Sequence, residues 1–394
     1  MQVEDLEGAE APALCALDQT ASLLAENILA SSDTTRADRL WPADAMVFQT
    51  NALNVAYGAT GTSLFLFDVL GCLPANVRGW LVNQPVDSVA YPPGLYSGIA
   101  GIAWSFAEIG LLERACELMR LLPRAALRFD ATDMFDGCAG WGLAALALFL
   151  KTGYEEFRSL ACEAGDFLVR TAEHEVTGSY WRRRGDGLVA LGFGFGGSGI
   201  GLFLLYLWRL TDDERYLTVA RDAMMFEVAH GQVRADALVW GTTTESEGHR
   251  PYWLRGGAGV ATALIRFAQV LQEPHYEQLA RRAVEPCGYF FSAAPHLFEG
   301  LAGMGESLLD MYFLTGETPY LTAARQKAEQ ALLFQMNRPV GVAFPGRYLL
   351  RISHDYGIGG AGIGSFLRRV STKSPRRFHD IGTELGIVGL GDPS

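Results

Sequence analysis

The sequence predicts an all-α protein, an α/α toroid in which seven inner helices are surrounded by seven outer helices. A Gly-x-x-Gly motif recurs seven times at intervals of 39 to 60 residues, which is typical of one structural unit repeated along a chain. Each motif begins an apolar stretch, and an amphipathic stretch commonly follows. The motifs are Gly58–Gly61, Gly98–Gly101, Gly137–Gly140, Gly196–Gly199, Gly256–Gly259, Gly300–Gly303 and Gly359–Gly362.

The unit that begins at Gly300 illustrates the pattern. Residues 300–314 are apolar on nearly every face, which predicts a helix buried on all sides and starting at the motif. A turn at 315–317 ends this helix, and residues 319–333 predict a second helix with one charged face. Alternation of the two kinds of helix predicts an inner ring inside an outer ring. An open superhelix of helix pairs is the alternative.

The other units follow the same order along the chain. Amphipathic helices are predicted at Tyr154–Leu168, Tyr216–Val228 and His275–Cys287, each after an apolar helix that begins at a motif. We expect the first glycine of each motif to adopt backbone angles that other residues avoid, and the second to let inner helices approach closely. The repeat runs from about residue 50 to 370, so we expect one domain over 1–394 with short tails at about 1–14 and 372–394.

Composition and charge exclude several classes of protein. The formal net charge of −12, without a basic stripe, argues against a nucleic-acid partner and suits a soluble acidic protein. The acidic N-terminus does not resemble a signal peptide, and the apolar runs are too short to cross a membrane. Six scattered cysteines without a CxxC motif are typical of reduced thiols, so we expect a cytoplasmic protein.

Chemistry is expected at the mouth of the toroid, where seven inner helices would begin together. Their positive N-terminal dipoles would favour an anion or an oxyanion there. The residues around each first glycine would line the central cavity. A carboxylate such as Asp133 can equally be a cap, and a histidine there can be an ordinary loop residue. The candidates are Asp133, Asp136, Cys138, Trp253, Arg255, His296, Glu299, His354 and Asp355.

A metal site is not predicted from the residues. Cys138, His249, His296 and His354 are types of residue that bind zinc. No two of them stand at a ligand spacing such as CxxC or HxxxH. We therefore expect no metal in the hub.

Several motifs resemble those of the lanthionine synthetase C-like cyclases over roughly residues 40 to 370. The segments are Gly98-Ile-Ala-Gly-Ile-Ala, Asp136-Gly-Cys-Ala-Gly-Trp-Gly-Leu-Ala and Phe298-Glu-Gly-Leu-Ala-Gly-Met-Gly-Glu. Members of that family are α/α toroids that add peptide cysteine thiols to dehydroalanine or dehydrobutyrine. The resemblance implies formation of thioether rings in a dehydrated precursor peptide.

The chain departs from the zinc-dependent members of that family. Their Trp-Cys-Tyr-Gly and Cys-His-Gly motifs supply three zinc ligands, but the matching segments here read Trp253-Leu254-Arg255-Gly256 and Phe298-Glu299-Gly300. Phe195 stands where the family has a catalytic histidine before the fourth motif, which places Phe195 at the cavity wall. Asp133 matches the family's acidic residue before the third motif. The resemblance therefore implies a cyclase without a zinc cofactor.

Loss of the zinc ligands resembles the cyclase domain of class III lanthionine and labionin synthetases. In that group the cyclase follows lyase and kinase domains, and the segments 38–44 and 53–58 resemble the start of its cyclase domain. The chain has no kinase signature, so the resemblance implies an excised domain or a separate cyclase-like subunit. The implied partners are the precursor peptide and lanthipeptide kinase and lyase domains or subunits.

A zinc-free mechanism would rely on the hub residues. Free cysteine is already a few per cent thiolate at neutral pH, and helix N-termini with Arg255 would stabilise the thiolate and the enolate. His354 or His296 would return a proton to carbon, and Asp133 would orient a partner or act as the acid. Glu299 is a poor candidate because a carboxylate opposes thiolate formation.

Two other functions remain open at this stage. The chain can be an inert scaffold that binds the precursor peptide and its kinase and lyase partners. It can also be a carbohydrate-active α/α barrel that uses Asp133 and Glu299 as its two carboxylates.

Overall fold

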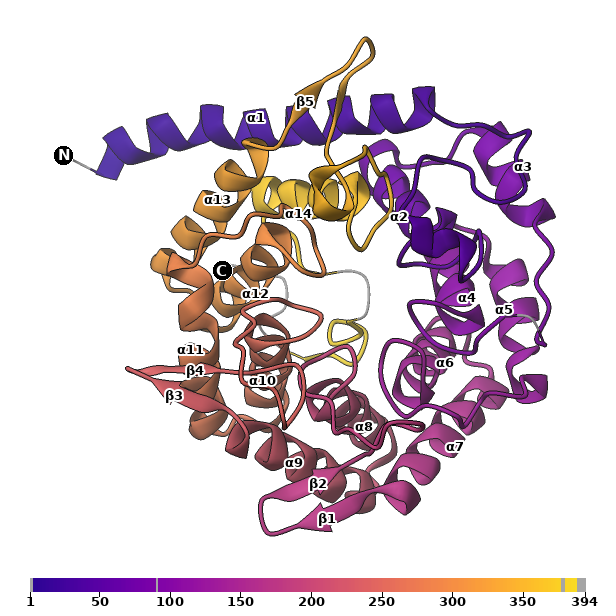
Figure 1. The fold of residues 1–394 in the computed structure, drawn as a ribbon, viewed down its shortest axis with the longest axis vertical. Coiled ribbons are helices and arrows are strands. Elements are labelled where there is room, and N and C mark those ends of the chain that lie inside the picture. Colours follow the sequence, from indigo (N-terminus) through magenta and orange to yellow (C-terminus); the bar gives the residue numbers. More distant parts are fainter. Residues whose placement is uncertain (1–2, 90, 377–379, 388–394) are drawn as a thin grey trace.

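Fourteen α-helices and three short β-hairpins form the computed structural model, which describes residues 3–89, 91–376 and 380–387. The helices lie in two concentric rings around one axis (Figure 1). This arrangement confirms the predicted all-α toroid with seven inner and seven outer helices. Across the described residues, none of the helices is long and apolar enough to cross a membrane.

The inner ring consists of the helices that begin at the glycine motifs. The first glycine of each motif is the N-cap of an inner helix, as the sequence predicts. These helices are buried along most of their length because both faces contact protein. They are α2 (Ala59–Leu70), α4 (Ile99–Glu108), α6 (Cys138–Thr152), α8 (Gly197–Thr211), α10 (Gly257–Leu271), α12 (Leu301–Thr315) and α14 (Gly360–Thr372).

The outer ring consists of the amphipathic helices. From α4 to α12, each inner helix packs most extensively against the outer helix that follows it. The outer helices are α1 (Val3–Ala30), α3 (Ala75–Asn83), α5 (Leu112–Met119), α7 (Glu155–Thr171), α9 (Glu214–Ala229), α11 (Pro274–Tyr289) and α13 (Thr318–Leu332).

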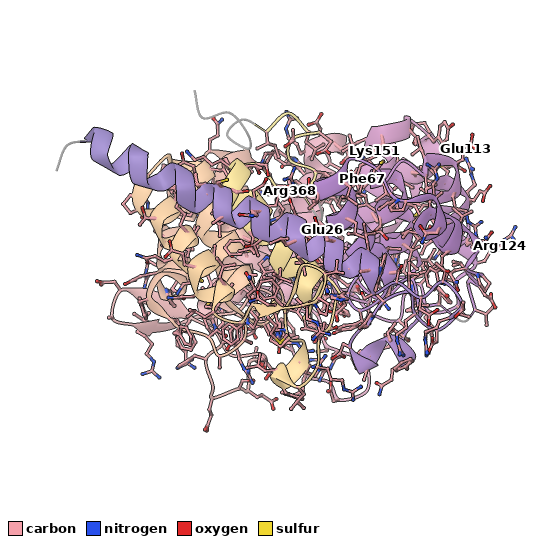
Figure 2. All side chains as sticks on the ribbon, turned by 90° about the horizontal axis from the view of Figure 1, so that it is seen from above. Glu26, Phe67, Glu113, Arg124, Lys151 and Arg368 are labelled. Carbon is pink, nitrogen blue, oxygen red and sulfur yellow. The ribbon has the colours of Figure 1, made fainter. Side chains whose placement is uncertain are left out.

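The first and the last helix of the described chain pack together, which gives the last inner helix its outer partner. The last inner helix, α14, packs against α1, and Arg368 of α14 forms an ion pair with Asp18 of α1 at 2.6 Å. In the view from above, α1 crosses the rim of the ring beside Arg368 (Figure 2). Residues 3–14, which the sequence analysis treats as a tail, belong to this helix.

Three antiparallel hairpins lead from outer helices to hub loops. They are β1 (Glu173–Glu175) with β2 (Gly178–Tyr180), β3 (Gln232–Arg234) with β4 (Ala237–Val239), and β5 (Met336–Asn337) with β6 (Val342–Ala343). In the first of them Glu173 lies opposite Tyr180. The hairpins follow α7, α9 and α13, respectively.

A closed belt of backbone hydrogen bonds joins the seven hub loops. The residue two positions before each first glycine donates its N–H to the carbonyl of the equivalent residue in the next repeat, over 2.8 to 3.0 Å. The last of these bonds runs from Gly357 back to Ala56, so the belt is complete and an open superhelix is excluded. In order, its members are Ala56, Tyr96, Phe135, Gly194, Leu254, Phe298 and Gly357.

The motif glycines are required mainly because space is short. Six of the seven first glycines have negative φ, and only Gly256 is positive at 137°. The expectation of unusual backbone angles is therefore wrong at six motifs. A Cβ at Gly137 would lie 2.5 Å from the backbone nitrogen of Asp133, and one at Gly259 would lie 2.0 Å from the carbonyl oxygen of Trp253. Neither position can hold a side chain.

Aromatic rings fill the centre of the hub. The ring of Tyr96 stacks on Phe135 with centroids 5.3 Å apart and meets the edge of Phe298 at 5.2 Å. Phe298 also stacks with Trp253 at 6.0 Å, and Phe135 stacks with Phe195 at 5.1 Å. Such contacts add to the burial of apolar area in holding the seven loops together.

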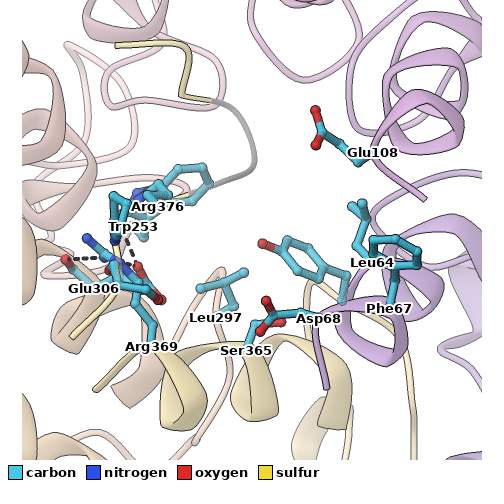
Figure 3. Close-up of a pocket in the computed structure, with 13 residues that line it drawn as sticks. Leu64, Phe67, Asp68, Glu108, Trp253, Leu297, Glu306, Ser365, Arg369 and Arg376 are labelled. Atoms are coloured by element: carbon cyan, nitrogen blue, oxygen red, sulfur yellow. Dashed lines mark hydrogen bonds and ion pairs between the residues drawn. The ribbon is translucent and has the colours of Figure 1, made fainter. Parts of the chain in front are cut away.

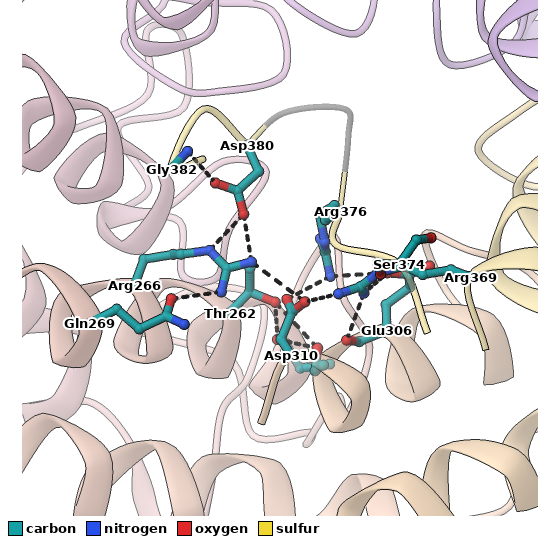
Figure 4. A network of polar contacts seen from close by, with 12 residues as sticks. Thr262, Arg266, Gln269, Glu306, Asp310, Arg369, Ser374, Arg376, Asp380 and Gly382 are labelled. Carbon is teal, nitrogen blue, oxygen red and sulfur yellow. Dashed lines mark hydrogen bonds and ion pairs between the residues drawn. The ribbon is translucent and has the colours of Figure 1, made fainter. Parts of the chain in front are cut away.

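The far end of the ring, opposite the helix N-termini, contains buried charges. Arg266 donates to Asp380 at 2.6 Å, and Asp310 pairs with Arg369 at 2.6 Å and with Arg376 at 2.9 Å (Figure 4). None of the five side chains is more than 8% exposed. Burial opposes ionisation of Asp310, but the three guanidinium groups hold its pKa well below its ordinary range.

These charges differ from two expectations. The inner helices are not apolar on nearly every face as predicted, because Arg266, Asp310 and Arg369 lie on α10, α12 and α14. The segment at about 372–394 is not only the predicted tail, since its residues Arg376 and Asp380 lie buried inside the ring. The buried charges remain ionised because each has partners of opposite sign.

Candidate functional site

A pocket opens at the mouth of the toroid, where α6 and α8 begin. We call it the mouth pocket. Asp133, Asp136 and Phe195, which the sequence analysis proposed, line it together. Its outer wall comes from α7, from β1 and from the segment 181–184. The structure thus brings three of the proposed residues into one cavity.

Asp133 serves as a cap for its own loop. Its Oδ1 accepts the N–H of Asp136, three residues later, at 2.7 Å. Asn54 in the first repeat accepts the N–H of Tyr57 at 2.7 Å, and Asp355 in the seventh accepts that of Ile358 at 2.9 Å. The bond at Asp133 is therefore a feature of the repeat and needs only an acceptor oxygen.

The pKa of Asp133 is raised to about 7. Burial is the main cause, and the nearby carboxylate of Asp136 adds to it, while backbone N–H groups partly oppose the shift. At neutral pH the two neighbouring carboxyl groups therefore readily hold a proton. Such a group suits proton exchange near neutral pH.

Asp136 stands one residue before the first glycine of its motif and is held by the preceding repeat. Ser97 donates its hydroxyl to Oδ1 of Asp136 at 2.5 Å. A Cβ at Gly94 would lie 2.4 Å from the Asp136 backbone, so the absence of a side chain there permits the contact. Burial raises the pKa of Asp136, while Ser97 and the positive charge of Arg255 oppose the shift.

Arg255 stands at the equivalent position two repeats later. Its guanidinium lies over the ring of Phe195, 4.4 Å from the ring centroid. Its Nε is buried and has no hydrogen-bond partner among the described residues. Among the described residues no ion pair joins Arg255 to Asp136. The guanidinium can therefore bind an oxygen atom of a ligand.

The rim of the mouth pocket carries paired charges. Three consecutive arginines line the pocket, and each of them is neutralised by a carboxylate. The rim is therefore not a free cationic patch. The pairs are Arg182 with Glu173, Arg183 with Asp186, and Arg184 with Asp130.

The two candidate histidines do not line the mouth pocket. His296 is 4% exposed and bonds the Pro345 carbonyl through Nε2 at 3.1 Å, and His354 is 1% exposed. Burial lowers the pKa of each to about 4, so both are neutral at neutral pH. Neither histidine therefore has the position or the protonation state needed to donate a proton to a substrate in the mouth pocket.

Asp355 lies beneath a cover formed by residues near Asp44 and Arg347. The backbone N–H of Asp44 donates to Asp355 at 3.1 Å, and Arg347 donates to the Asp44 carboxylate at 2.9 Å. Asp355 is 1% exposed, and burial raises its pKa to about 6. It does not line the mouth pocket.

Three other proposed residues lie outside the mouth pocket. Cys138 points toward α7, with its sulfur 3.6 Å from the Ala164 carbonyl, so its assignment to the cavity wall is wrong. Burial raises the pKa of this thiol well above its ordinary value. Trp253 lines a second cavity at the far end. Glu299 is half-buried and stands one residue before its motif, at the position equivalent to Asp136.

The second cavity lies on the other side of the aromatic centre. Leu297, Trp253 and Tyr356, each three residues before a first glycine, line it. Figure 3 shows Glu306, Arg369 and Arg376 on one side of this cavity and Glu108 on the other. Two residues one position before a motif, Asp136 and Phe195, thus line the mouth pocket, whereas three residues three positions before a motif line the cavity at the far end.

Sequence reasoning missed Ser97. It stands one residue before Gly98, at the position that Asp136 occupies before Gly137. Comparison of the residue directly before the first glycine across the repeats identifies Ser97 together with Asp136, Phe195 and Arg255. The missing signal was the register within the repeat, not the type of residue.

The family model described as lanthionine synthetase C-like protein matches residues 81–381. The chain is also 29% identical over 346 residues to a protein named "Probable SapB synthase" from Streptomyces coelicolor. That match covers 86% of this chain and 36% of the other protein. The chain therefore spans about a third of the length of this relative.

Solved structures share the toroid at low sequence identity. A nisin cyclase superposes with a TM-score of 0.60 at 14% identity, covering 86% of this chain and 93% of that one. A GH76A alpha-1,6-mannanase from Salegentibacter sp. HEL1_6 superposes with a TM-score of 0.56 at 12% identity, covering 91% and 98%. Both likenesses concern the fold alone.

The residues present do not fit a zinc site at the positions that the resemblance indicates. Two of those positions hold Leu254 and Phe298, whose side chains have no ligand atom. Phe298 packs against Tyr96 in the aromatic centre. Within the described ranges, no three His, Cys, Asp or Glu side chains gather where they could hold a metal ion.

Proposed function

The chain belongs to the lanthionine synthetase C-like family, and from this premise we propose that it is a lanthipeptide cyclase that acts without zinc. The reaction is the Michael-type addition of a cysteine thiol of a dehydrated precursor peptide to dehydroalanine or dehydrobutyrine. The family match supports the reaction class, and the aliphatic and aromatic residues Leu254 and Phe298 support zinc independence.

The observation that carries the proposal is the carboxyl pair in the mouth pocket, beside which the cation Arg255 packs on the ring of Phe195, a residue of the pocket wall. Asp133 and Asp136 supply proton-exchanging groups whose pKa values are raised by burial. Arg255 has an unpartnered buried nitrogen among the described residues, which suits an oxygen that becomes negatively charged. Thiol addition to an unsaturated amide requires a base and a site for an oxyanion beside it.

The reaction conserves atoms and electrons without a redox partner. The thiol loses its proton to a carboxylate, sulfur bonds to the β-carbon, and the π electrons of the double bond move to the amide oxygen. The resulting enolate lies against Arg255. The carboxyl group then returns its proton to the α-carbon, which completes the thioether.

The proposed partners follow from the family and from the length of the relative. We propose that kinase and lyase domains or subunits of the class III kind generate the dehydrated residues that this chain consumes. The chain covers 36% of the SapB synthase relative, which supports partners carried on additional sequence. The reaction needs reduced cysteine, so we expect it in the cytoplasm.

A thiol-alkylation mass assay tests the proposal. A synthetic peptide carrying one dehydroalanine and one cysteine is incubated in a metal chelator, with and without the protein. We expect faster loss of the free thiol with the protein, and tandem mass spectrometry should locate the thioether. No acceleration, even with kinase and lyase partners supplied, would contradict the cyclase proposal and leave the scaffold function. Acceleration that chelator abolishes would contradict zinc independence.

A further inference from the structure

We infer that Asp136 is the catalytic carboxyl group that exchanges protons with the substrate, and that Asp133 is a positioning residue that acts through Asp136. The inference rests on the proposed cyclase function and assigns the roles within its carboxyl pair. It differs from the expectation from sequence, in which Asp133 orients a partner or acts as the acid and Asp136 lines the cavity.

Comparison of the repeats separates the two carboxyl groups. The bond from Asp133 to the N–H three residues later recurs at Asn54 and at Asp355, in loops that do not line the mouth pocket. At Asn54 an amide oxygen makes this bond, so the role requires no ionisable group. The described contacts of Asp133 are therefore explained by the shape of the loop.

Asp136 has the opposite character. The equivalent positions in the other repeats hold Tyr57, Ser97, Phe195, Arg255, Glu299 and Ile358, so no feature of the repeat requires a carboxylate. The Oδ1 of Asp136 accepts the Ser97 hydroxyl, and its Oδ2 accepts no hydrogen bond within the described chain. A carboxylate with one anchored oxygen and one available oxygen is suited to remove a proton from a bound thiol.

The surroundings of Asp136 place it next to the proposed oxyanion site. Phe195 lines the same pocket and carries Arg255 on its ring. Arg255 lies close enough to Asp136 to influence its ionisation, yet the two form no ion pair in the described structure. A substrate between them would meet the carboxylate through its thiol and the guanidinium through its amide oxygen.

Asp133 acts on this group by position and by charge. Its bond to the N–H of Asp136 fixes the loop that carries the carboxylate. Its negative charge lies close by and favours the protonated form of the pair. The charged groups that line the pocket around the pair are Asp130, Glu173, Arg182, Arg183 and Arg184, and Arg255 faces it from the fifth repeat.

The test compares Asp136→Asn and Asp133→Asn in the thiol-alkylation assay, over a range of pH. Asp136→Asn should lower the rate by about 10²-fold or more, which is the usual loss of a general base. Asp133→Asn keeps the acceptor oxygen that Asn54 uses, so it should lose less than about tenfold. Because it removes a negative charge, it should also move the rise of the rate with pH to lower pH.

Asp355→Asn is the matched control. Asp355 has the same place in its repeat and the same bond three residues ahead, but it lies outside the mouth pocket. We expect an unchanged cyclisation rate and pH profile, and circular dichroism verifies that each variant folds. The pair Asp136→Glu and Asp136→Gln, matched in shape, is used if the asparagine variant does not fold, and only the glutamate form should be active.

The outcomes separate this inference from the proposed function. If the wild-type protein cyclises the peptide, two results would overturn the assignment of roles and leave the cyclase proposal intact. One is an Asp136→Asn variant that keeps its activity. The other is an Asp133→Asn variant that loses as much activity as Asp136→Asn. A wild-type protein that does not accelerate thiol loss, alone or with its partners, overturns both.

Discussion

The two halves of the toroid mouth are built from the same repeat but differ in what covers them. Asp133 on the open half and Asp355 on the covered half both accept a backbone N–H three residues ahead. Asp133 lines the mouth pocket, whereas Asp355 is 1% exposed beneath Asp44. The repeat thus determines the backbone role of a position, and the cover determines whether the side chain can meet a ligand.

The halves also differ in how their charges are satisfied. On the covered half Arg347 donates to the Asp44 carboxylate through two nitrogens. On the open half Arg255 keeps a buried nitrogen without a partner among the described residues. A buried donor without a partner costs folding free energy, and a ligand oxygen beside the mouth pocket would supply the partner that Arg255 lacks.

The largest effect on the cyclisation rate is expected from a substitution on the open half. Arg255→Met keeps much of the contact with Phe195 but removes the cation over its ring. We expect the cyclisation rate to fall by about 10²- to 10³-fold, the usual cost of one oxyanion donor. Kinetics on the synthetic peptide measure this loss, and a rate within threefold of wild type would remove Arg255 from the mechanism.

The two buried histidines should each contribute a loss of stability as the pH falls. In the unfolded chain a histidine has a pKa near 6.5, whereas those of His296 and His354 in the folded protein are about 4. Between pH 6.5 and 4 the two imidazoles bind protons in the unfolded chain and not in the folded chain, so their contribution to stability falls as the pH falls. At about 1.4 kcal/mol per pKa unit this contribution amounts to a few kcal/mol. The raised pKa values of Asp133 and Asp355 contribute with the opposite sign, so the histidine contribution is measured as a difference between wild type and a histidine variant.

Urea unfolding at pH 7, 5.5 and 4 measures this dependence. His354→Leu is the informative variant because Nδ1 of His354 is buried and lacks a partner in the described structure. The variant should be at least as stable as wild type at pH 4 and should lose less stability on acidification. An unchanged slope with pH would show that His354 has the same pKa in the folded and the unfolded chain.

Arg347→Gln should destabilise the covered half without changing the chemistry. Removal of the guanidinium leaves the buried Asp44 carboxylate without its ion-pair partner. We expect a loss of about 1 to 3 kcal/mol in the free energy of unfolding, measured by urea denaturation. The cyclisation rate of the folded variant should equal that of wild type, and a drop like that of Arg255→Met would show that the two halves act together.

The smallest effect on the cyclisation rate is expected from removal of the serine hydroxyl that donates to Asp136. Ser97→Ala removes the hydroxyl that lowers the pKa of Asp136, so the rise of the rate with pH should move to higher pH. The loss of one such bond is worth about 1 kcal/mol, which corresponds to a few-fold change in rate at neutral pH.

Ser353→Ala is the control for this variant, because Ser353 donates to Asp355 on the covered half. It should leave the pH profile of cyclisation unchanged. An identical shift in both variants would mean that the serines affect the fold and not the base.

Much of the ring could be predicted because its signals are local. The glycine at 256 is followed by an apolar helix within its own repeat, and the amphipathic helix comes next in the chain. The sequence did not predict why the first glycines are needed. At Gly137 the reason is crowding, because the folded loop brings the backbone nitrogen of Asp133 within 2.5 Å of where a Cβ would lie.

The candidate site was predicted in part. Asp133, Asp136 and Phe195 share one pocket because equivalent residues of neighbouring repeats lie side by side around the belt. His296 and His354 were grouped with them because they also precede motifs, although segments from elsewhere in the chain bury them. The register identifies which residues face the mouth, but it contains no information on what lies above them.

The sequence by itself determined the toroid, the number of repeats and the positions that face its centre, because each of these follows from patterns within some sixty residues. Only the tertiary structure decided which half of the mouth is open. It also decided that Cys138 faces α7 and that Arg376 and Asp380 lie inside the ring. The physical reason is that these outcomes depend on contacts between distant segments, such as Asp44 with Asp355 and Arg266 with Asp380.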